Sequence, residues 1–255
     1  MVKAFKDKPV KFIGVGAGDT PLETSAYVRD NKLELPVFAD NLGLMEARYG
    51  IKISLQNIWQ YRVIGPDGKV VGYDMSQPAL EKVLSAAKVE FRYKGKGYDA
   101  KLDPIVDLFE WGQHAQGMKL LAPQRKSPTK ALAESANKLY DAVKEEGKEW
   151  AAEAEKLAGT DPVRTYDLDA KVAAVFAGDE LGKSVAEPLK KLAADKAVQQ
   201  ELAARKVMTQ TETQIAQMPP AQKKQAAQLY LVVAKKFAGT PTGDRAAALA
   251  KELGG

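Results

Sequence analysis

The first third of the chain alternates short apolar runs with breaks rich in glycine and proline. Short runs that contain many β-branched residues are typical of strands. Four of them are predicted to be strands: Val10–Val15, Leu33–Phe38, Tyr61–Ile64 and Val70–Tyr73. The last two flank the sequence Gly-Pro-Asp-Gly at 65–68, which favours a tight hairpin turn.

Three helices are predicted between and after these strands. Thr20, Pro21 and Glu23 have the residue types of a helix start, namely a capping threonine, a proline in the first turn and a glutamate three residues after the cap. That helix is expected to run to about Asn31. The other two are Leu42–Tyr49, which stops at Gly50, and Pro78–Lys88.

The pattern changes near Lys101, after a polar, glycine-interrupted segment that begins at Glu90. From Asp103 onward the residues are mostly alanine, lysine, glutamate, glutamine and leucine, and only helices are expected. These helices are Pro104–Leu121, Thr129–Leu157, Asp161–Ala177, Leu181–Ala193, Lys196–Gln217, Pro220–Ala238 and Thr242–Leu253. We therefore predict an α/β domain over residues 1–101, followed by an all-α domain of helical hairpins over residues 102–255.

An internal repeat supports the helical hairpins. Leu168–Leu192 aligns without a gap with Leu229–Leu253, and each copy contains a helix that ends in Phe-Ala-Gly, a tight turn and a second helix. Glu110–Leu121 similarly looks like the turn and second helix of a tetratricopeptide unit, with Gly112 in the turn and Gly117 where helices cross. The fixed period of that repeat is not kept, so the domain is predicted to be tetratricopeptide-like.

Composition excludes several kinds of chemistry. The 255 residues include no cysteine and a single histidine, His114, which rules out disulfides, thiolate metal sites, cysteine-based catalysis and centres with several histidines. The net charge is +5, but no long run of like charges or basic–aromatic interleaving indicates a nucleic-acid partner. No apolar run is long enough for a membrane span, and the charged N-terminus is not a signal peptide as it stands.

A glycine-rich loop provides one candidate for binding chemistry. Gly14, Gly16 and Gly18 follow a predicted strand, and Asp40 ends the next strand, where a ribose-binding acid would lie. The third glycine comes one residue too early for the dinucleotide fingerprint, and Thr20 and Pro21 delay the helix. We therefore interpret Gly14–Gly18 as a loop at the sheet edge and keep a nucleotide-dependent enzyme as the alternative.

No other residue is nominated as catalytic, cofactor-binding or metal-binding, and no cofactor is expected. The sequence suggests no carboxylate or nucleophile to act with His114, which is interpreted as a packing or surface residue. The tryptophans are interpreted as core anchors: Trp59, Trp111 and Trp150. Five glutamates interleaved with lysines are interpreted as the solvated face of a long helix: Glu145, Glu146, Glu149, Glu153 and Glu155.

Taken together, the segments of the first third resemble the redoxin branch of the thioredoxin superfamily, a family of exported thiol–disulfide oxidoreductases. The resemblance covers Met1–Ala87 and rests on FKDKPVKFIGVGAGDT, LPVFAD, YRVIGPDGKVVGY and LEKVL in that order. In that family the lysine-rich start is the tail of the first long helix, and Pro-Asp-Gly-Lys is the turn of the terminal hairpin. The resemblance implies a partial thioredoxin-like sheet with flanking helices and, for a full-length form, the periplasm or cell envelope.

Two features of that family are missing. Its first strand and its Cys-x-x-Cys would precede Met1, and the place of its cis-proline falls near Trp59. We expect Val10–Val15 and Tyr61–Ile64 to be partly uncovered as a result. Either Met1 is an internal methionine of a longer reading frame, which we favour because Val2–Lys11 has the pattern of a helix end, or the chain is a degenerate relative.

These observations predict a thioredoxin-like protein that is redox-inactive as given, since thiol–disulfide exchange requires a thiolate. Its expected role is that of a protein-binding scaffold that contacts a protein partner through the helical tail. The alternative remains a small nucleotide-dependent enzyme that uses Gly14–Gly18.

Overall fold

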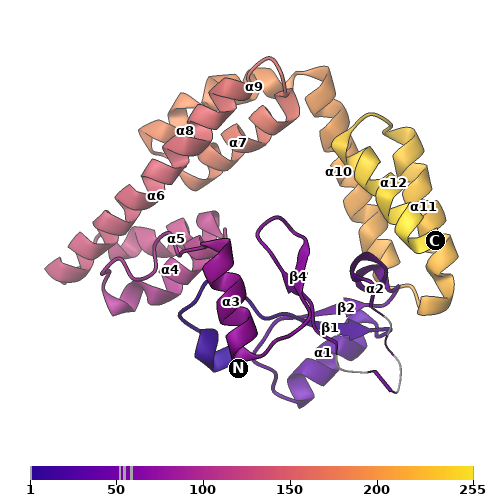
Figure 1. Cartoon of the computed structure of the whole chain (residues 1–255). Coiled ribbons are helices and arrows are strands. Elements are labelled where there is room, and N and C mark those ends of the chain that lie inside the picture. The colour runs from indigo at the N-terminus through magenta and orange to yellow at the C-terminus, as the bar shows by residue number, and fades with distance from the viewer. Residues whose placement is uncertain (1, 52, 54–55, 58–59, 255) are drawn as a thin grey trace. The chain divides into compact units, whose positions relative to one another are not determined.

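The computed structural model describes residues 2–51, 53, 56–57 and 60–254 (Figure 1). Helices make up most of this part of the chain, and its strands form two sheets of two strands each. The chain therefore combines α and β structure, with helices in large excess. By its internal contacts it divides into two compact units, one made of Met1–Glu90 with Gln200–Gly255 and the other of Phe91–Gln199.

The first unit begins with a 3-10 helix, Val2–Phe5, and then alternates strands and helices. These elements are β1 (Gly14–Ala17), α1 (Pro21–Asp30), β2 (Val37–Asp40), α2 (Leu44–Tyr49), β3 (Val63–Ile64), β4 (Val70–Gly72) and α3 (Gln77–Ala87). Each predicted strand is thus present, but β1 and β2 each start four residues later than expected. The apolar residues that suggested earlier starts lie in the irregular segments that lead into β1 and β2.

Strands β1 and β2 are parallel and are connected through α1, with Val15 opposite Phe38 and Gly16 opposite Ala39. Successive side chains of a strand point to opposite faces. Helix α1 covers the face of Gly16, where an added Cβ would lie 3.1 Å from Thr24 Oγ1. Val15 and Phe38 lie on the other face and are 41% and 58% exposed. The described residues therefore cover only one face of this strand pair.

Strands β3 and β4 form the predicted antiparallel hairpin. The turn at residues 65–68 is closed by a hydrogen bond from Gly65 N–H to Lys69 O (2.8 Å), and Gly68 has φ +76°. Tyr61 and Ile64 are exposed, as Ile13 and Val15 are. The expectation that these two segments are partly uncovered is therefore confirmed.

The C-terminal helices also belong to the first unit. They are α10 (Lys196–Ile215, from Gln200 on), a 3-10 turn at Pro220–Gln222, α11 (Lys223–Lys236) and α12 (Pro241–Gly254). Leu42 lies in their apolar cluster. Asn41 Nδ2 donates hydrogen bonds to Met218 O (2.7 Å) and Ile215 O (3.3 Å) at the end of α10. The predicted domain boundary at Lys101 stays a prediction. The structure shows in addition that residues 41–42 pack against residues 200–255.

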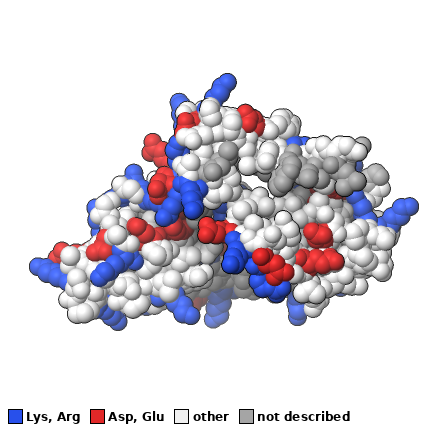
Figure 2. Space-filling model, turned by 90° about the horizontal axis from the view of Figure 1, so that it is seen from below, with Lys and Arg blue, Asp and Glu red and all other residues white. Residues whose placement is uncertain are grey.

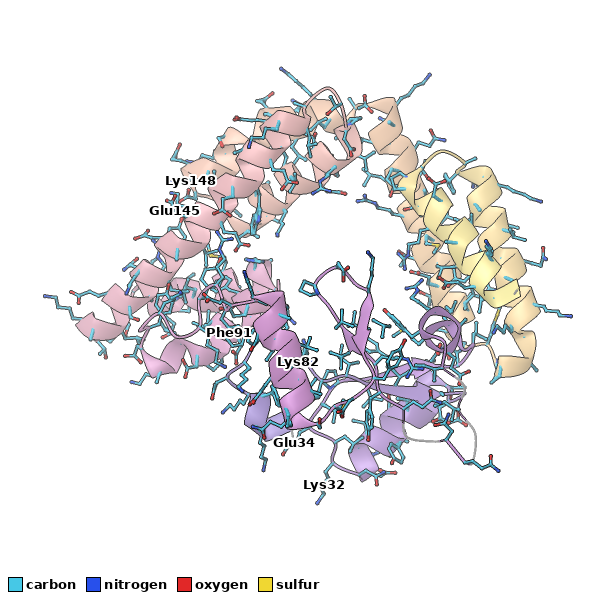
Figure 3. All side chains as sticks on the ribbon, in the orientation of Figure 1. Lys32, Glu34, Lys82, Phe91, Glu145 and Lys148 are labelled. Atoms are coloured by element: carbon cyan, nitrogen blue, oxygen red, sulfur yellow. The ribbon has the colours of Figure 1, made fainter. Side chains whose placement is uncertain are left out.

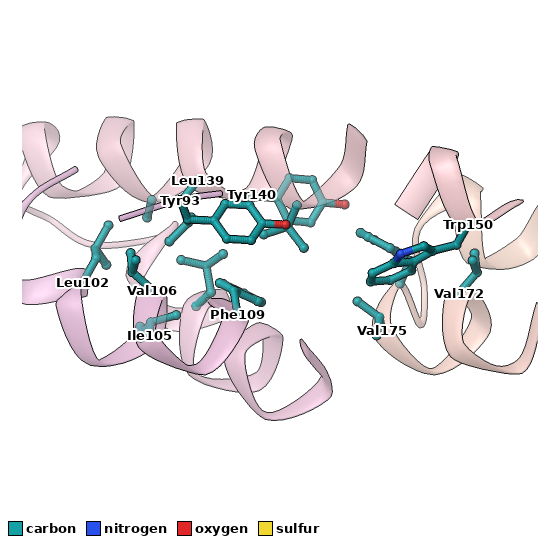
Figure 4. Packing of buried hydrophobic residues seen from close by; sticks show 14 of the residues in the cluster. Tyr93, Leu102, Ile105, Val106, Phe109, Leu139, Tyr140, Trp150, Val172 and Val175 are labelled. Carbon is teal, nitrogen blue, oxygen red and sulfur yellow. The ribbon is translucent and has the colours of Figure 1, made fainter. Parts of the chain in front are cut away.

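The second unit is a stack of helices with its own core. Its elements are a 3-10 turn at Ala100–Leu102, α4 (Asp103–Glu110), α5 (His114–Gln124), α6 (Lys130–Leu157), α7 (Pro162–Val175), α8 (Glu180–Ser184) and α9 (Ala186–Ala193). Figure 4 shows two parts of this core, with Phe109 near Tyr93 and Val106, and Trp150 near Val172 and Val175. The 28-residue helix α6 contributes to both.

From residue 100 on, the described residues form helices only, as predicted. Two predicted helices are each divided in two. Gly112, with φ +75°, separates α4 from α5, and Val185 separates α8 from α9. Gly117 lies at a close helix contact, because an added Cβ would come within 2.6 Å of the Phe109 ring. Gly112 in the turn and Gly117 at the crossing are therefore both confirmed.

The internal repeat has one geometry in both copies. Phe176 is the C-cap residue of α7 and Phe237 that of α11, and Gly178 and Gly239 follow with φ +85° and +80°. In each copy the third residue of the next helix is a glycine, Gly182 or Gly243, which lies against the carbonyl of that phenylalanine. None of the described helices is both long and apolar enough to cross a membrane.

Candidate functional site

The second unit contains a partly buried polar cluster that the sequence did not predict, made of Tyr93, His114 and Glu146. Tyr93 precedes α4, His114 is the first residue of α5, and Glu146 comes from the middle of α6. The Tyr93 hydroxyl donates a hydrogen bond to Glu146 Oε2, and His114 Nε2 lies 3.0 Å from the same oxygen. One carboxylate oxygen therefore joins three segments that are far apart in the sequence.

Aromatic rings surround the histidine. The Trp150 ring meets the His114 ring edge to face at 4.8 Å between centroids, and the Phe109 ring lies at 5.8 Å. His114 is 5% exposed, and its other ring nitrogen, Nδ1, is buried without a hydrogen-bond partner among the described residues. Of the two predicted roles for His114, packing or surface, the structure shows packing.

Positive charges lie next to the carboxylate. Arg92 Nη1 is 3.9 Å from Glu146 Oε1, and Arg92 Nη2 is 2.7 Å from Glu149 Oε1. Lys171 Nζ lies 3.4 Å from the centroid of the Trp150 ring, on which a cation is favoured by the ring quadrupole. A partly buried carboxylate is stabilised when cations and hydrogen-bond donors lie this close.

The same contacts account for the pKa shifts in the cluster. Burial alone raises the pKa of Glu146, but hydrogen bonds from His114 and Tyr93 outweigh it and hold that pKa below its ordinary value. Burial raises the pKa of the Tyr93 hydroxyl, and the hydrogen bond to Glu146 raises it further. Burial lowers the pKa of Lys171, which the negative charge of Glu146 partly offsets. Glu146 is therefore the ionised acceptor, and Tyr93 remains a donor.

A second carboxylate fixes the segment that carries Tyr93. The backbone N–H groups of Arg92, Tyr93 and Lys94 all donate to the Glu110 carboxylate, at 3.1, 2.5 and 2.6 Å. Glu110 is the last residue of α4, so the end of this helix positions the Tyr93 backbone. Together, Glu110 and Glu146 hold Tyr93 by its backbone and by its hydroxyl.

This arrangement is suited to holding the fold together rather than to catalysis. A general base must reach the proton that it removes, and the His114 ring is enclosed by Phe109 and Trp150. No sequence signal marks Glu146, because it lies among five other glutamates of α6. Its side chain is 15% exposed, whereas that of Glu145 is 65% exposed. The solvated-face interpretation was therefore wrong for Glu146, which faces α5.

The predicted tryptophan anchors have different outcomes. Trp150 is buried in the core, as predicted. Trp111 is 40% exposed at the C-cap of α4, so its prediction was wrong; the buried residues of this helix are Ile105, Val106 and Phe109. Trp59 lies outside the described residues.

The glycine-rich segment is organised differently from a nucleotide site. Gly14 and Gly16 belong to β1, and the N-terminus of α1 is closed by its own capping box. Glu23 accepts hydrogen bonds from Thr20 N–H (2.8 Å) and Thr20 Oγ1 (2.7 Å). A phosphate binds well at a helix N-terminus because backbone N–H groups there are free. Here a carboxylate already occupies that position.

Asp40 is also engaged. It is buried, and its carboxylate accepts hydrogen bonds from the N–H groups of Leu44 (2.7 Å), Met45 (2.9 Å) and Glu46 (3.1 Å) at the start of α2. It therefore caps this helix. The nucleotide-dependent alternative stays a prediction that neither Glu23 nor Asp40 supports.

The described residues include no group of three or more His, Cys, Asp or Glu side chains arranged to hold a metal ion. Lys and Arg side chains are interspersed with Asp and Glu on the face shown in Figure 2. Comparison with protein-family models, curated proteins and solved structures finds no match to this chain.

Proposed function

We propose that this chain is a protein-binding scaffold, a thioredoxin-like relative without thiol chemistry, whose N-terminal α/β segment binds a partner polypeptide. The observation that supports binding is the uncovered face of the β1–β2 pair, where Val15 and Phe38 lie opposite each other and are exposed. Parallel sheets are ordinarily covered on both faces, because the connections between their strands place helices there. A partner that covers this face would supply the missing layer.

The distribution of exposed apolar side chains favours the N-terminal segment over the helical tail. Most of the large hydrophobic residues that the described chain exposes lie before residue 90, among them Ile13, Val15 and Phe38. Exposed apolar surface is typical of interaction sites. The chain order of a parallel β1–α1–β2 unit, a hairpin and α3 supports the thioredoxin-like part of the proposal.

The sequence predicted that the partner contacts the helical tail. Helices α4–α7 and α10–α12 direct their larger apolar residues into two buried clusters. The tail still exposes single apolar residues, such as Leu120 and Val232. This distribution favours the β1–β2 face over the tail as the binding surface.

Site-specific photocross-linking tests the proposal. Phe38 is replaced by benzoylphenylalanine in the full chain, and Val232 of α11, which is similarly exposed, is replaced in a matched control. We expect one adduct of defined mass at position 38. An excess of the chain without benzoylphenylalanine should suppress this adduct, whereas an excess of the Val15→Asp chain should not. An adduct only at position 232, no adduct, or an adduct with the mass of two chains would contradict the proposal.

A second assay tests the absence of thiol chemistry. Because the chain has no cysteine, it should not accelerate reduction of insulin by a thiol reductant. A rate above that of the reductant alone would show that this part of the proposal is wrong.

A further inference from the structure

A groove separates the β3–β4 hairpin from helix α3 in the first unit. It has a volume of about 550 Å³, within the range of natural ligand pockets. Its apolar lining includes Val71 and Tyr73 from the hairpin and Ala79, Val83 and Ala86 from α3. This surface is distinct from the Val15–Phe38 face.

The hairpin side of the groove has a strand that can accept a further strand. Within the described residues β4 pairs only with β3. An unpaired strand edge offers backbone donors and acceptors to an extended peptide, and adjacent apolar side chains then provide pockets for alternate residues of that peptide. The exposed Val71 and Tyr73 are placed for this role.

Two charged side chains line the groove, Asp74 and Lys82, and they differ in whether they already have partners. Asp74 accepts hydrogen bonds from Ser76 N–H (2.7 Å) and Ser76 Oγ (2.8 Å), so both of its oxygens have donors. Glu81, the neighbour of Lys82 on α3, is paired with Lys8 at 2.8 Å. Lys82 lines the groove, is exposed, and has no ion-pair partner among the described residues (Figure 3). The groove thus combines an apolar floor with one available ammonium group.

We propose that this groove binds an extended peptide segment whose alternate residues are apolar and which ends in a carboxylate. The apolar side chains contact Val71, Val83 and Ala86, the backbone adds to the edge of β4, and the carboxylate pairs with Lys82. The inference goes beyond the scaffold role, because it assigns a second surface with a ligand of stated chemistry.

Fluorescence anisotropy with the full chain tests this assignment. The probe is a pool of fluorescein-labelled hexapeptides with Val, Ile, Leu or Phe at alternate positions and a free C-terminal carboxylate; the same pool with a C-terminal amide is the comparison. We expect saturable binding, with the acid pool bound about 2- to 5-fold more tightly than the amide pool, the range of a partly exposed ion pair. In Lys82→Gln the two pools should bind equally.

Neighbouring residues of α3 provide a matched pair of variants. Ala86 lines the groove and Ser85 does not, and both are exposed, so neither substitution disturbs a core. Ala86→Glu should weaken binding of the acid pool about 10-fold or more, because it adds bulk and negative charge inside the groove, while Ser85→Glu should bind as the unmodified chain does.

Three results would overturn the inference: no saturable binding up to about 1 mM, the weakest affinity relevant here; equal affinity of the acid and amide pools; or equal binding by the two α3 variants. Phe38→Asp separates this site from the proposed scaffold surface. It should leave peptide binding unchanged, and loss of peptide binding in Phe38→Asp would assign the peptide to the β1–β2 face instead.

Discussion

Gly182 and Gly243 occupy the same position in the two copies of the helical hairpin. A Cβ at Gly182 would lie 2.2 Å from Phe176 O, and a Cβ at Gly243 would lie 2.1 Å from Phe237 O. In both copies this carbonyl also accepts the N–H of the residue three positions on, Asp179 at 3.0 Å and Thr240 at 3.1 Å. The hairpin therefore requires glycine because the two helices meet backbone to backbone.

Alanine at either position should destabilise the protein. Because the clashing atom belongs to the backbone, it cannot move as a side chain would, and we expect Gly182→Ala and Gly243→Ala to lower the free energy of unfolding by about 1–3 kcal/mol each. Urea denaturation measures the loss. Gly254→Ala, where no atom lies within 4 Å, is the control and should change stability by less than about 0.5 kcal/mol. Equal effects at 243 and 254 would contradict the close contact.

Glu146 and Glu145 are adjacent on α6 but should respond differently to removal. Glu146→Ala leaves the Tyr93 hydroxyl and His114 Nε2 buried without their shared acceptor, so we expect a loss of about 2–4 kcal/mol. Glu145→Ala should stay within about 0.5 kcal/mol, since that side chain is exposed. Thermal unfolding of the two variants gives the comparison. If both losses are small, Glu146 does not hold the three segments together.

Asp179 should make stability depend on pH in the acid range. Burial alone would raise the pKa of Asp179, but hydrogen bonds from the Tyr140 hydroxyl, Leu181 N–H and Lys144 lower it to about 2, from an ordinary value of 3.8. A lowered folded pKa stabilises the ionised form, so this contribution is present above pH 4 and is lost as pH falls toward 2. Its size is on the order of 1–2 kcal/mol.

Asp179→Asn tests this dependence. The variant should be less stable than the unmodified chain at neutral pH, and the difference should shrink as the pH falls toward 2. Chemical denaturation at a series of pH values measures it, with Glu180→Gln as the control, because Glu180 is an exposed neighbour. A constant difference across this range would mean that Asp179 ionisation does not contribute.

Adjacent positions of β2 test which face of the strand pair is covered. Phe38→Ser should change stability by less than about 0.5 kcal/mol, because the side chain is largely exposed. Val37→Ser should cost about 1–2 kcal/mol, since Val37 packs on the face covered by α1, where its Cγ2 lies 3.1 Å from the position of a Cβ on Gly14. Urea denaturation in the absence of a partner measures both. A larger loss at Phe38 than at Val37 would reverse the assignment of faces.

Local sequence signals predicted most helix starts and turns. Thr20, Pro21 and Glu23 predicted the capping box of α1, and the Gly-Pro-Asp-Gly turn predicted the hairpin. The two Phe-Ala-Gly motifs predicted equivalent helix ends at Phe176 and Phe237. These features depend on residues within a few positions of one another, so the pattern along the chain contains what is needed to predict them.

The polar cluster could not be predicted in this way. Glu146 has the same local pattern as Glu145, and only the packing of α5 against α6 places His114 beside it. The link from Asn41 to the end of α10 joins residues far apart in sequence, through backbone carbonyls that no side-chain pattern marks. Such contacts depend on which helix faces meet.

The chain's own pattern of apolar, glycine and capping residues thus accounts for the type and approximate limits of its helices and strands, and its lack of cysteine excludes thiol chemistry. Tertiary packing determines which side chains are covered. It leaves Val15 and Phe38 exposed on a parallel strand pair and encloses His114 with Glu146. The physical reason is that local propensity is fixed by neighbours in sequence, whereas burial and pairing are fixed by neighbours in space.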